Sequence, residues 1–375
     1  MSETLRYTDE NMSGAGTQAG PLAYLSEVAR ALESKPFRPH PLFKHGHAQT
    51  LAGYAWPRRV LLLRLRDEER MFEVEPGVRL LGHCRWQTTE ARERPTILLL
   101  HGLEGSSSSR YMIGTGEKAY ARGFNVIRLN LRNCGDTEHL TPTLYNSGLS
   151  GDIRAVIREL VDCDRLQTIF LVGFSLSGNI VLKMAGEDGD GVAREIAGVC
   201  AVSPSVELSA CAEAIERRSN WVYQQSFMRS LRRRIRNKQK LYPELYDTSD
   251  LHLVRTIRQF DDRYTALDGG YQNADDYYKR ASALPLIPNI RVPSLIIHAQ
   301  DDPFIPFQPL VDSAVMDNPY VLLLAPRHGG HVSFVAADTY TEDRFWAENR
   351  AVEFCDLIHG HVAARRAQQR VVLSP

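Results

Sequence analysis

Short apolar runs recur along the chain from residue 96 onward, and each is bounded by glycine, proline, serine or charged residues. The six strongest runs span residues 96–100, 125–129, 168–172, 196–202, 294–297 and 321–324. Runs this short and continuous are typical of strands buried on both faces, as in a parallel sheet. Helix-length segments such as 151–162 and 177–186 lie between some of them. This alternation predicts an α/β protein with a mostly parallel, doubly wound sheet.

The segment before the first of these runs carries weaker signals. Residues 60–65, 72–74 and 78–86 are candidate strands. Residues 36–58 contain four prolines and two glycines, so we expect an extended arm rather than a helix there. We expect residues 1–35 to be a flexible leader, because this stretch begins with a long polar segment that carries glycine and serine.

One interval breaks the alternation of strands and helices. Residues 205–290 carry no strong apolar run and are rich in Arg, Tyr and Asp, so we expect a mostly helical cap inserted between the fourth and fifth runs. Near the end of the chain, residues 342–359 place apolar side chains at helical spacing. This spacing predicts a terminal helix that packs on the sheet.

Residues 229–240 form a strongly basic segment within the expected cap. Seven of these twelve residues are Arg or Lys, while Met228, Leu231 and Ile235 recur at helical spacing. The pattern predicts a basic amphipathic helix. Two interpretations stay open: a solvated outer face of a lid, or a surface that makes peripheral contact with an anionic membrane and so suits a lipid substrate.

Composition narrows the class of protein further. Among 375 residues, 45 Lys and Arg balance 45 Asp and Glu, so the net charge does not favour nucleic-acid binding. The six cysteines form no C-x-x-C pair, which favours buried, reduced thiols. His45 and His47 lie close together, but no third ligand for a metal can be identified. The polar N-terminus is unlike a signal peptide, and no apolar run approaches the ~20 residues of a membrane-spanning helix. We therefore expect a cytoplasmic protein.

Polar residues follow the third run where its strand should end. The sequence GFSLSG occupies residues 173–178. A serine at a sharp strand-to-helix turn is a nucleophile elbow, whose strained backbone requires small residues two positions before and after the serine. Gly173 meets this requirement before Ser175, and Ser177 stands after it where glycine is usual. A glycine- and serine-rich turn that merely opens a helix is the alternative.

An acid and a base follow the fifth and sixth runs. Asp301 and Asp302 precede a proline turn, and we favour Asp302 because Pro303 follows it directly. His328 and His331 lie on a glycine-rich loop, and we favour His331, which follows the two glycines. Ligands bind beyond the carboxyl ends of strands in open parallel sheets. At that edge an aspartate can orient a histidine, and the histidine can take the proton of a serine hydroxyl.

The order Ser175, Asp302, His331 along the chain is the order of α/β-hydrolases and differs from those of chymotrypsin and subtilisin. The first run is followed by HGLEGS, a glycine-bearing turn that can aim a backbone N–H at a developing oxyanion. The second donor should follow the nucleophile, so we predict that the amides of Leu103 and Leu176 form the oxyanion hole. A simple glycine turn is the alternative.

Together these segments resemble the α/β-hydrolase subgroup that contains the bacterial YheT proteins, plant EMB8-like proteins and their animal relatives. The matching segments are HAQT at 47–50, HGLEGS at 101–106, NLRNCG at 130–135, GFSLSGN at 173–179, FDDRYT at 260–265, DDPF at 301–304 and HGGHV at 328–332. The chain departs from the family at two places. It has LSG at 176–178 where members usually have Leu-Gly-Gly, and RNC at 132–134 where members often have Arg-Gly-Cys.

The matching segments run from about residue 36 to 335. We expect an α/β-hydrolase domain over residues 36–375, with a cap insertion at about 205–290. The resemblance implies a serine hydrolase that acts on carboxylic esters, such as short-chain esters or acylglycerols, through the triad Ser175, Asp302 and His331. Such chemistry requires no cofactor. The alternatives are an acyltransferase on the same fold and a non-catalytic lipid-binding protein.

Overall fold

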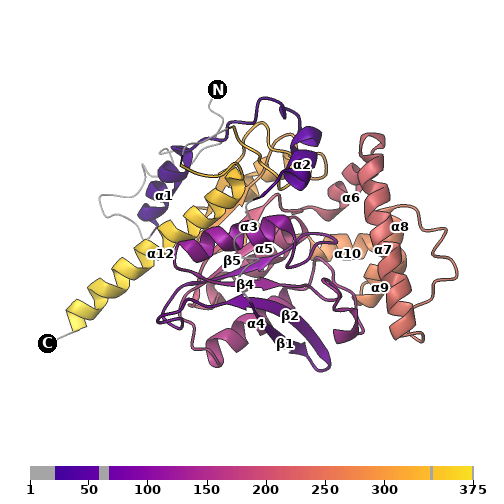
Figure 1. The fold of residues 1–375 in the computed structure, drawn as a ribbon, viewed down its shortest axis with the longest axis horizontal. Helices are drawn as coiled ribbons and strands as arrows, with labels where there is room; N and C mark the ends of the chain where they lie inside the picture. The colour runs from indigo at the N-terminus through magenta and orange to yellow at the C-terminus, as the bar shows by residue number, and fades with distance from the viewer. Residues whose placement is uncertain (1–21, 59–66, 338–340, 374–375) are drawn as a thin grey trace.

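The computed structural model describes residues 22–58, 67–337 and 341–373, and an eight-stranded sheet forms its centre (Figure 1). The strands are β1 (Glu68–Glu75), β2 (Val78–Arg85), β3 (Thr96–Leu100), β4 (Asn125–Leu129), β5 (Ile169–Phe174), β6 (Ile196–Val202), β7 (Ser294–Ile297) and β8 (Val321–Leu324). Their order across the sheet is β1-β2-β4-β3-β5-β6-β7-β8. β1 and β2 pair antiparallel, and the pairs among β3 to β8 are all parallel. The predicted α/β fold with a mostly parallel sheet is confirmed.

All six apolar runs of the sequence form strands of this sheet. Every residue of β3, β4, β5, β7 and β8 is buried. Alternate side chains enter two separate hydrophobic layers: Leu98 and Leu100 pack on one face of β3, and Ile97 and Leu99 pack on the other. Burial on both faces explains why these runs are continuously apolar instead of alternating.

Helices cover both faces of the sheet. They are α1 (Ala23–Glu33), α3 (Arg110–Ala121), α4 (Ser150–Asp162), α5 (Leu176–Asp188), α11 (Ser313–Met316) and α12 (Trp346–Leu373). Side chains of α1, α3 and α12 join one hydrophobic layer, and side chains of α4, α5 and α11 join the other. The terminal helix is longer than the predicted 342–359, and its end projects from the body of the molecule (Figure 1).

Between β6 and β7 the chain forms a helical cap, at the right of Figure 1. It contains α6 (Leu208–Glu216), α7 (Trp221–Leu241), α8 (Ile257–Phe260), a π-helical segment (Asp261–Thr265), α9 (Ala266–Asp268) and α10 (Ala274–Ala281). Met228, Leu231 and Ile235 of α7 are buried in a hydrophobic cluster shared by the cap helices, as the helical spacing predicted.

The basic segment lies on α7 and is only partly solvated. Its exposed basic side chains are Arg229, Arg233, Arg236 and Lys240. Arg234 and Lys238 are buried instead. They lie four residues apart and therefore share one face of the helix. The interpretation as a solvated basic face fits the four exposed side chains, and it is wrong for Arg234 and Lys238.

Part of the expected flexible leader and part of the expected extended arm are helical. Ala23–Glu33 forms α1, and its apolar side chains, including Leu25 and Leu32, are buried against the rest of the protein. Gly46–Ala55 forms α2. Pro41 and Pro57 flank this helix without interrupting it, so the density of proline around it did not exclude helical structure.

The remaining predictions for this part of the chain have mixed outcomes. The candidate strands 72–74 and 78–86 lie in β1 and β2, although β2 ends at Arg85. The candidate strand 60–65 and residues 1–21 of the expected leader lie outside the described residues.

Candidate active site

Ser175 lies at a sharp turn between β5 and α5. Its backbone angles are φ +54° and ψ −116°, a conformation that residues other than glycine rarely adopt. A Cβ on Gly173 would come within 2.3 Å of the backbone oxygen of Ser177, so the turn requires glycine at that position. This is the steric requirement of a nucleophile elbow.

Ser177 stands where the family usually has glycine, and its hydroxyl has a structural role. The residue is fully buried, and its Oγ donates a hydrogen bond to the backbone oxygen of His101. This bond ties the elbow to the chain at the end of β3, where the glycine-bearing turn begins. The departure from the usual motif therefore preserves the turn and adds a contact that glycine cannot make.

The structure brings Ser175, His331 and Asp302 into one chain of hydrogen bonds. The Oγ of Ser175 lies 3.0 Å from Nε2 of His331, and Nδ1 of that ring lies 2.8 Å from Oδ2 of Asp302. The amides of Phe304 and Ile305 donate to the other carboxylate oxygen at 2.9 and 3.1 Å. Burial alone would raise the pKa of Asp302, but His331 and these hydrogen bonds lower it below its ordinary value. The carboxylate is therefore charged and able to orient the ring.

The neighbouring Asp301 and His328 form a separate pair. Nδ1 of His328 lies 3.1 Å from Oδ2 of Asp301, and the amide of Gly330 donates to the other oxygen of Asp301 at 3.0 Å. Asp301 thus helps to shape the histidine loop. Of the two aspartates and two histidines between which the sequence left a choice, Asp302 and His331 are the pair joined to the serine hydroxyl.

Helix α2 supports the loop that carries His331, a contact that the pattern of residues did not predict. The amide of His331 donates to Oγ1 of Thr50 at 2.9 Å. The buried side chain of Gln49 accepts from the amide of Val335 at 2.7 Å and donates to its carbonyl at 3.1 Å. The segment HAQT at 47–50 was the available signal, and it came from the family resemblance instead of from residue chemistry.

His101 holds the turn that carries Leu103. Its ring is buried, with Nε2 accepting from the amide of Leu131 at 3.1 Å and Nδ1 lying 2.8 Å from the backbone oxygen of Gly102. Because Nε2 accepts a hydrogen bond, the ring is neutral, and burial lowers its pKa to about 4. The amides of Leu103 and Leu176 donate to no acceptor among the described residues, so both are free to bind a developing oxyanion.

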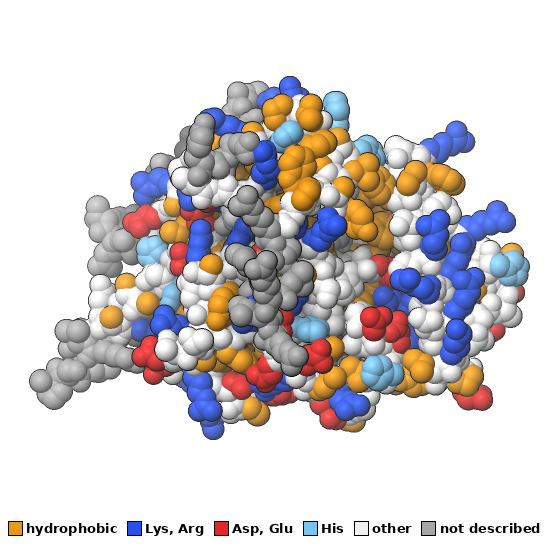
Figure 2. Space-filling view, in the orientation of Figure 1, with side chains coloured by type: hydrophobic (Ala, Val, Ile, Leu, Met, Phe, Trp, Pro, Cys, Tyr) orange, Lys and Arg blue, Asp and Glu red, His pale blue; other side chains and the backbone are white. Residues whose placement is uncertain are grey.

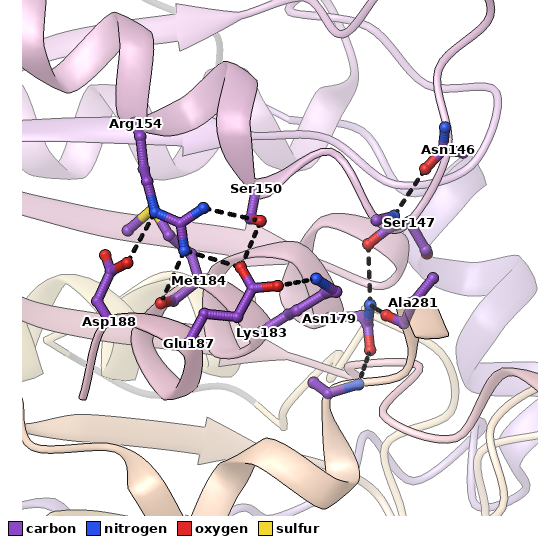
Figure 3. A network of polar contacts seen from close by, with 12 residues as sticks. Asn146, Ser147, Ser150, Arg154, Asn179, Lys183, Met184, Glu187, Asp188 and Ala281 are labelled. Carbon is purple, nitrogen blue, oxygen red and sulfur yellow. Dashed lines mark hydrogen bonds and ion pairs between the residues drawn. The ribbon is translucent and has the colours of Figure 1, made fainter. Parts of the chain in front are cut away.

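Asn179 anchors the first turn of α5, close to Ser175 in the chain (Figure 3). Its Nδ2 donates to the backbone oxygens of Ser147 and Ala281 at 3.1 and 2.7 Å. Its Oδ1 accepts from the amide of Ala283 at 2.8 Å. One buried amide side chain therefore fixes the helix behind the elbow to a loop of the core and to the end of the cap.

Two cavities meet at Ser175. One has a volume of about 90 Å³ and lies beneath the cap. Its lining is mainly apolar and includes Leu176, Leu208, Ile215, Leu231, Phe260 and Ile305. The other is a more polar groove of about 540 Å³ between the glycine-bearing turn, α2 and α7. Ser175 and Leu103 line both cavities.

The histidines of α2 and its approach do not build a metal site in the described part of the chain. No group of three or more His, Cys, Asp or Glu suited to a metal ion occurs among the described residues. His47 stacks on Tyr223 of α7, with ring centroids 5.7 Å apart, and so joins α2 to the cap. In the described chain, no helix combines the length and apolar character that crossing a membrane requires.

Comparison with known proteins identifies the family. Residues 95–338 match the family described as alpha/beta hydrolase fold. The chain is 33% identical to YheT of Escherichia coli (strain K12), over 84% of this chain and 92% of that protein. It is 31% identical to a monoacylglycerol lipase of Saccharomyces cerevisiae, over 72% of this chain but 61% of the lipase, less than two thirds of its length.

Solved structures agree on the fold. The esterase Pf2001 of Pyrococcus furiosus superimposes with a TM-score of 0.51 at 18% sequence identity, covering 80% of this chain and 98% of the esterase. An identity this low supports a shared architecture and no finer likeness. The family match and the YheT relative show that the chain belongs to the α/β-hydrolase family, among its YheT and EMB8-like members.

Proposed function

We propose that the protein is a serine hydrolase that cleaves carboxylic esters through an acyl-enzyme on Ser175. The observation that supports this is the continuous hydrogen-bond chain from Ser175 through His331 to Asp302. In the first step, Nε2 of His331 takes the hydroxyl proton while the serine oxygen attacks the acyl carbon. The buried carboxylate of Asp302 holds the ring with Nε2 facing the serine and stabilises the imidazolium that forms.

The amides of Leu103 and Leu176 complete the proposed mechanism. Both N–H groups would donate to the oxyanion of the tetrahedral intermediate, and the positive end of α5 would add to their field. The imidazolium of His331 then gives its proton to the departing alcohol. In the second half of the cycle, His331 activates a water molecule that attacks the acyl-enzyme, releases the carboxylic acid and restores Ser175.

The two cavities support a short-chain ester or an acylglycerol as the substrate. The apolar cavity of about 90 Å³ suits a compact acyl group, whose burial under the cap removes apolar surface from water. The polar groove, with Arg58, Arg110 and Ser230 in its wall, suits the alcohol part. Two relatives carry names that agree with this class of substrate, one as an esterase and one as a monoacylglycerol lipase.

The test uses the full chain, a panel of p-nitrophenyl esters of graded acyl length, and a fluorophosphonate probe. Wild type is expected to hydrolyse short-chain esters and to form a probe adduct on Ser175. Ser175→Ala should lose both properties while keeping its melting temperature. Folded wild-type protein that neither reacts with the probe nor hydrolyses any ester would contradict the proposal. Product analysis with added alcohols separates hydrolysis from acyl transfer.

We also propose that the exposed face of α7 makes peripheral contact with an anionic membrane. Figure 2 shows Lys and Arg side chains over the cap and apolar side chains over α2 on the same face of the molecule. Trp221 and Val222 at the start of α7 are 61% and 68% exposed, and Tyr54 of α2 is 80% exposed. Tyr54 also lines the polar groove. A basic surface with exposed apolar side chains is typical of interfacial helices.

Vesicle sedimentation tests this contact. The triple variant Arg229→Gln, Arg233→Gln, Arg236→Gln should bind phosphatidylserine vesicles about 100-fold more weakly than wild type, since each basic residue near such a surface contributes about 1 kcal/mol. The matched control replaces three exposed basic residues outside α7, Arg79, Arg92 and Lys279, with Gln. Equal losses in both variants, or no binding by wild type, would contradict a specific contact through α7.

A further inference from the structure

Arg234, one of the two buried basic residues of α7, reaches the loop that carries Leu103. Its Nε lies 2.9 Å from Oε1 of Glu104, the residue directly after Leu103, and both charged side chains are less than a tenth exposed. Ser230, also on α7, donates to the other carboxylate oxygen. The cap helix therefore holds both oxygens of a carboxylate that belongs to the glycine-bearing turn of the core.

Glu104 is fixed through its backbone as well as its side chain. Its φ of +54° lies in the left-handed region that residues other than glycine rarely occupy. The hydroxyl of Tyr145 accepts from its amide at 3.0 Å and lies 2.9 Å from Oε1. Burial alone would raise the pKa of the Glu104 carboxyl, but the charge of Arg234 and the hydrogen bonds lower it, so the carboxylate is charged. The peptide that precedes Glu104 contains the carbonyl of Leu103, so the fixed conformation of Glu104 restrains Leu103, whose own N–H lies one peptide earlier in the chain.

The same face of α7 holds a second loop of the core. Arg234 donates from a guanidinium nitrogen to the backbone oxygen of Asn133, and Nζ of Lys238 lies 3.0 Å from Oδ1 of Asn133. Asn133 has a φ of +62°, which explains why glycine is common there and why asparagine, a residue that tolerates this region, can replace it. The asparagine side chain then provides an acceptor for the cap that glycine lacks.

We propose that the Arg234–Glu104 ion pair is the means by which the cap holds the amide of Leu103 in the oxyanion hole, which makes both residues positioning residues. This inference rests on the proposed function, because it concerns a donor of the same site. Buried ion pairs contribute little stability, since the loss of hydration offsets most of the attraction between the charges. An oxyanion donor, in contrast, depends on placement to within a fraction of an ångström. The location of this pair, one residue from the donor, favours a positioning role.

The experiment measures kcat and KM for a short-chain p-nitrophenyl ester and the inhibition constant of a trifluoromethyl ketone with the same acyl chain. The ketone forms a tetrahedral adduct whose oxyanion needs the same donors. Loss of a whole oxyanion donor costs about 100- to 1,000-fold in kcat, so a misplaced donor should cost less. We expect Arg234→Met to lower kcat about 10- to 100-fold with KM within threefold, and to weaken ketone inhibition by a similar factor.

Two further variants and one control complete the design. Glu104→Gln keeps the size of the side chain and should lower kcat about fivefold or more, which keeps the test usable if Arg234→Met does not fold. The double variant should be no worse than Arg234→Met, because both changes act on the same ion pair. Arg154→Met is the control: it breaks ion pairs of 2.7 Å with Glu187 and Asp188 that join α4 to α5 (Figure 3), and kcat should stay within twofold of wild type.

The outcomes separate this proposal from the proposed function. If folded Arg234→Met and Glu104→Gln keep kcat within twofold of wild type, the positioning role is wrong although the esterase activity stands. It is also wrong if the loss falls entirely on KM, or if ketone inhibition is unchanged while kcat falls. If wild type has no activity, or Ser175→Ala retains it in full, the proposed function itself is wrong.

Discussion

The sheet and the cap bury polar side chains in different ways. In the sheet, strands β3 to β8 are nearly continuously apolar, and the polar residues of the candidate site come after strand ends, where backbone geometry places them. In the cap, charged side chains enter the helical packing itself: Arg234 and Lys238 on α7 are buried, and Asp261 at the start of the π-helical segment is partly buried. Each of these depends on a partner from another segment.

This difference implies different sensitivities to substitution and pH. The elbow that carries Ser175 at a strand end tolerates changes in the surrounding charge, because sterics and backbone hydrogen bonds shape the turn. A cap held by buried charges responds to the loss of one partner, because the other is left desolvated and unpaired.

The largest effect is expected from Asp302→Asn. The amide cannot stabilise the imidazolium of His331 and favours the wrong ring tautomer, so kcat for ester hydrolysis should fall by about 1,000- to 10,000-fold. Steady-state kinetics on a short-chain ester measures this. Asp301→Asn is the matched control one residue away, and because Asp301 contacts the loop through His328 and Gly330, its loss should stay below tenfold. Equal losses of kcat in the two variants would mean that Asp302 is not the residue that orients His331.

A second contrast compares two buried aliphatic residues, Leu98 of β3 and Ile235 of α7, both fully buried. Either substitution by alanine should leave a cavity that costs about 2–5 kcal/mol of local packing. For Leu98→Ala we expect that whole amount as a loss in the free energy of unfolding. For Ile235→Ala we expect faster amide hydrogen exchange in the cap while the sheet stays protected. Uniform exchange throughout the Ile235→Ala protein would show that the two regions unfold as one unit.

The sequence allowed the sheet to be predicted because strands buried on both faces leave a local signal. Each of the six apolar runs became a strand, and the residues after three of them are now joined by hydrogen bonds. Helix α2 gave no such signal. Its glycines and the prolines that flank it are typical of loops, and its role depends on Gln49 and Thr50 contacting a loop that is more than 280 residues away in the chain.

The local pattern also could not predict which basic side chains of α7 are buried. Helical periodicity placed Leu231 and Ile235 on the buried face correctly, and the same periodicity places Arg234 and Lys238 beside them. A basic residue at the edge of an apolar face is normally solvated. It is buried here because Glu104 and Asn133 of the core provide acceptors, and this pairing is a tertiary contact that no stretch of sequence contains.

Asp261 provides a test of the cap through pH. Burial raises its pKa to about 6, above the ordinary 3.8, although Tyr278 donates a hydrogen bond to it. Between these two values the folded state binds more protons than the unfolded state, so stability falls as pH rises, by up to about 3 kcal/mol from this group. Asp261→Asn removes this loss. The variant should therefore gain stability relative to wild type between pH 4 and pH 7.5, as urea unfolding would measure.

The control for this prediction is Asp190→Asn, whose carboxyl lies at the surface and is 94% exposed. Its stability difference from wild type should be the same at both pH values. A difference for Asp261→Asn that does not change with pH would mean that the carboxyl is ionised in the folded cap. In that case the cap would bury a full charge there, as it does at Arg234.

The smallest effect is expected from Ser177→Gly, which restores the residue usual in the family. The variant loses the hydrogen bond from Ser177 to the backbone oxygen of His101, and the loss should cost about 1 kcal/mol of unfolding free energy. Because the steric fit at Gly173 still shapes the turn, kcat should change less than about threefold. Ser177→Ala, which keeps the Cβ, separates the lost bond from the added backbone freedom of glycine. A large loss of kcat in either variant would mean that a side-chain contact holds the elbow, which would make this part of the core resemble the cap.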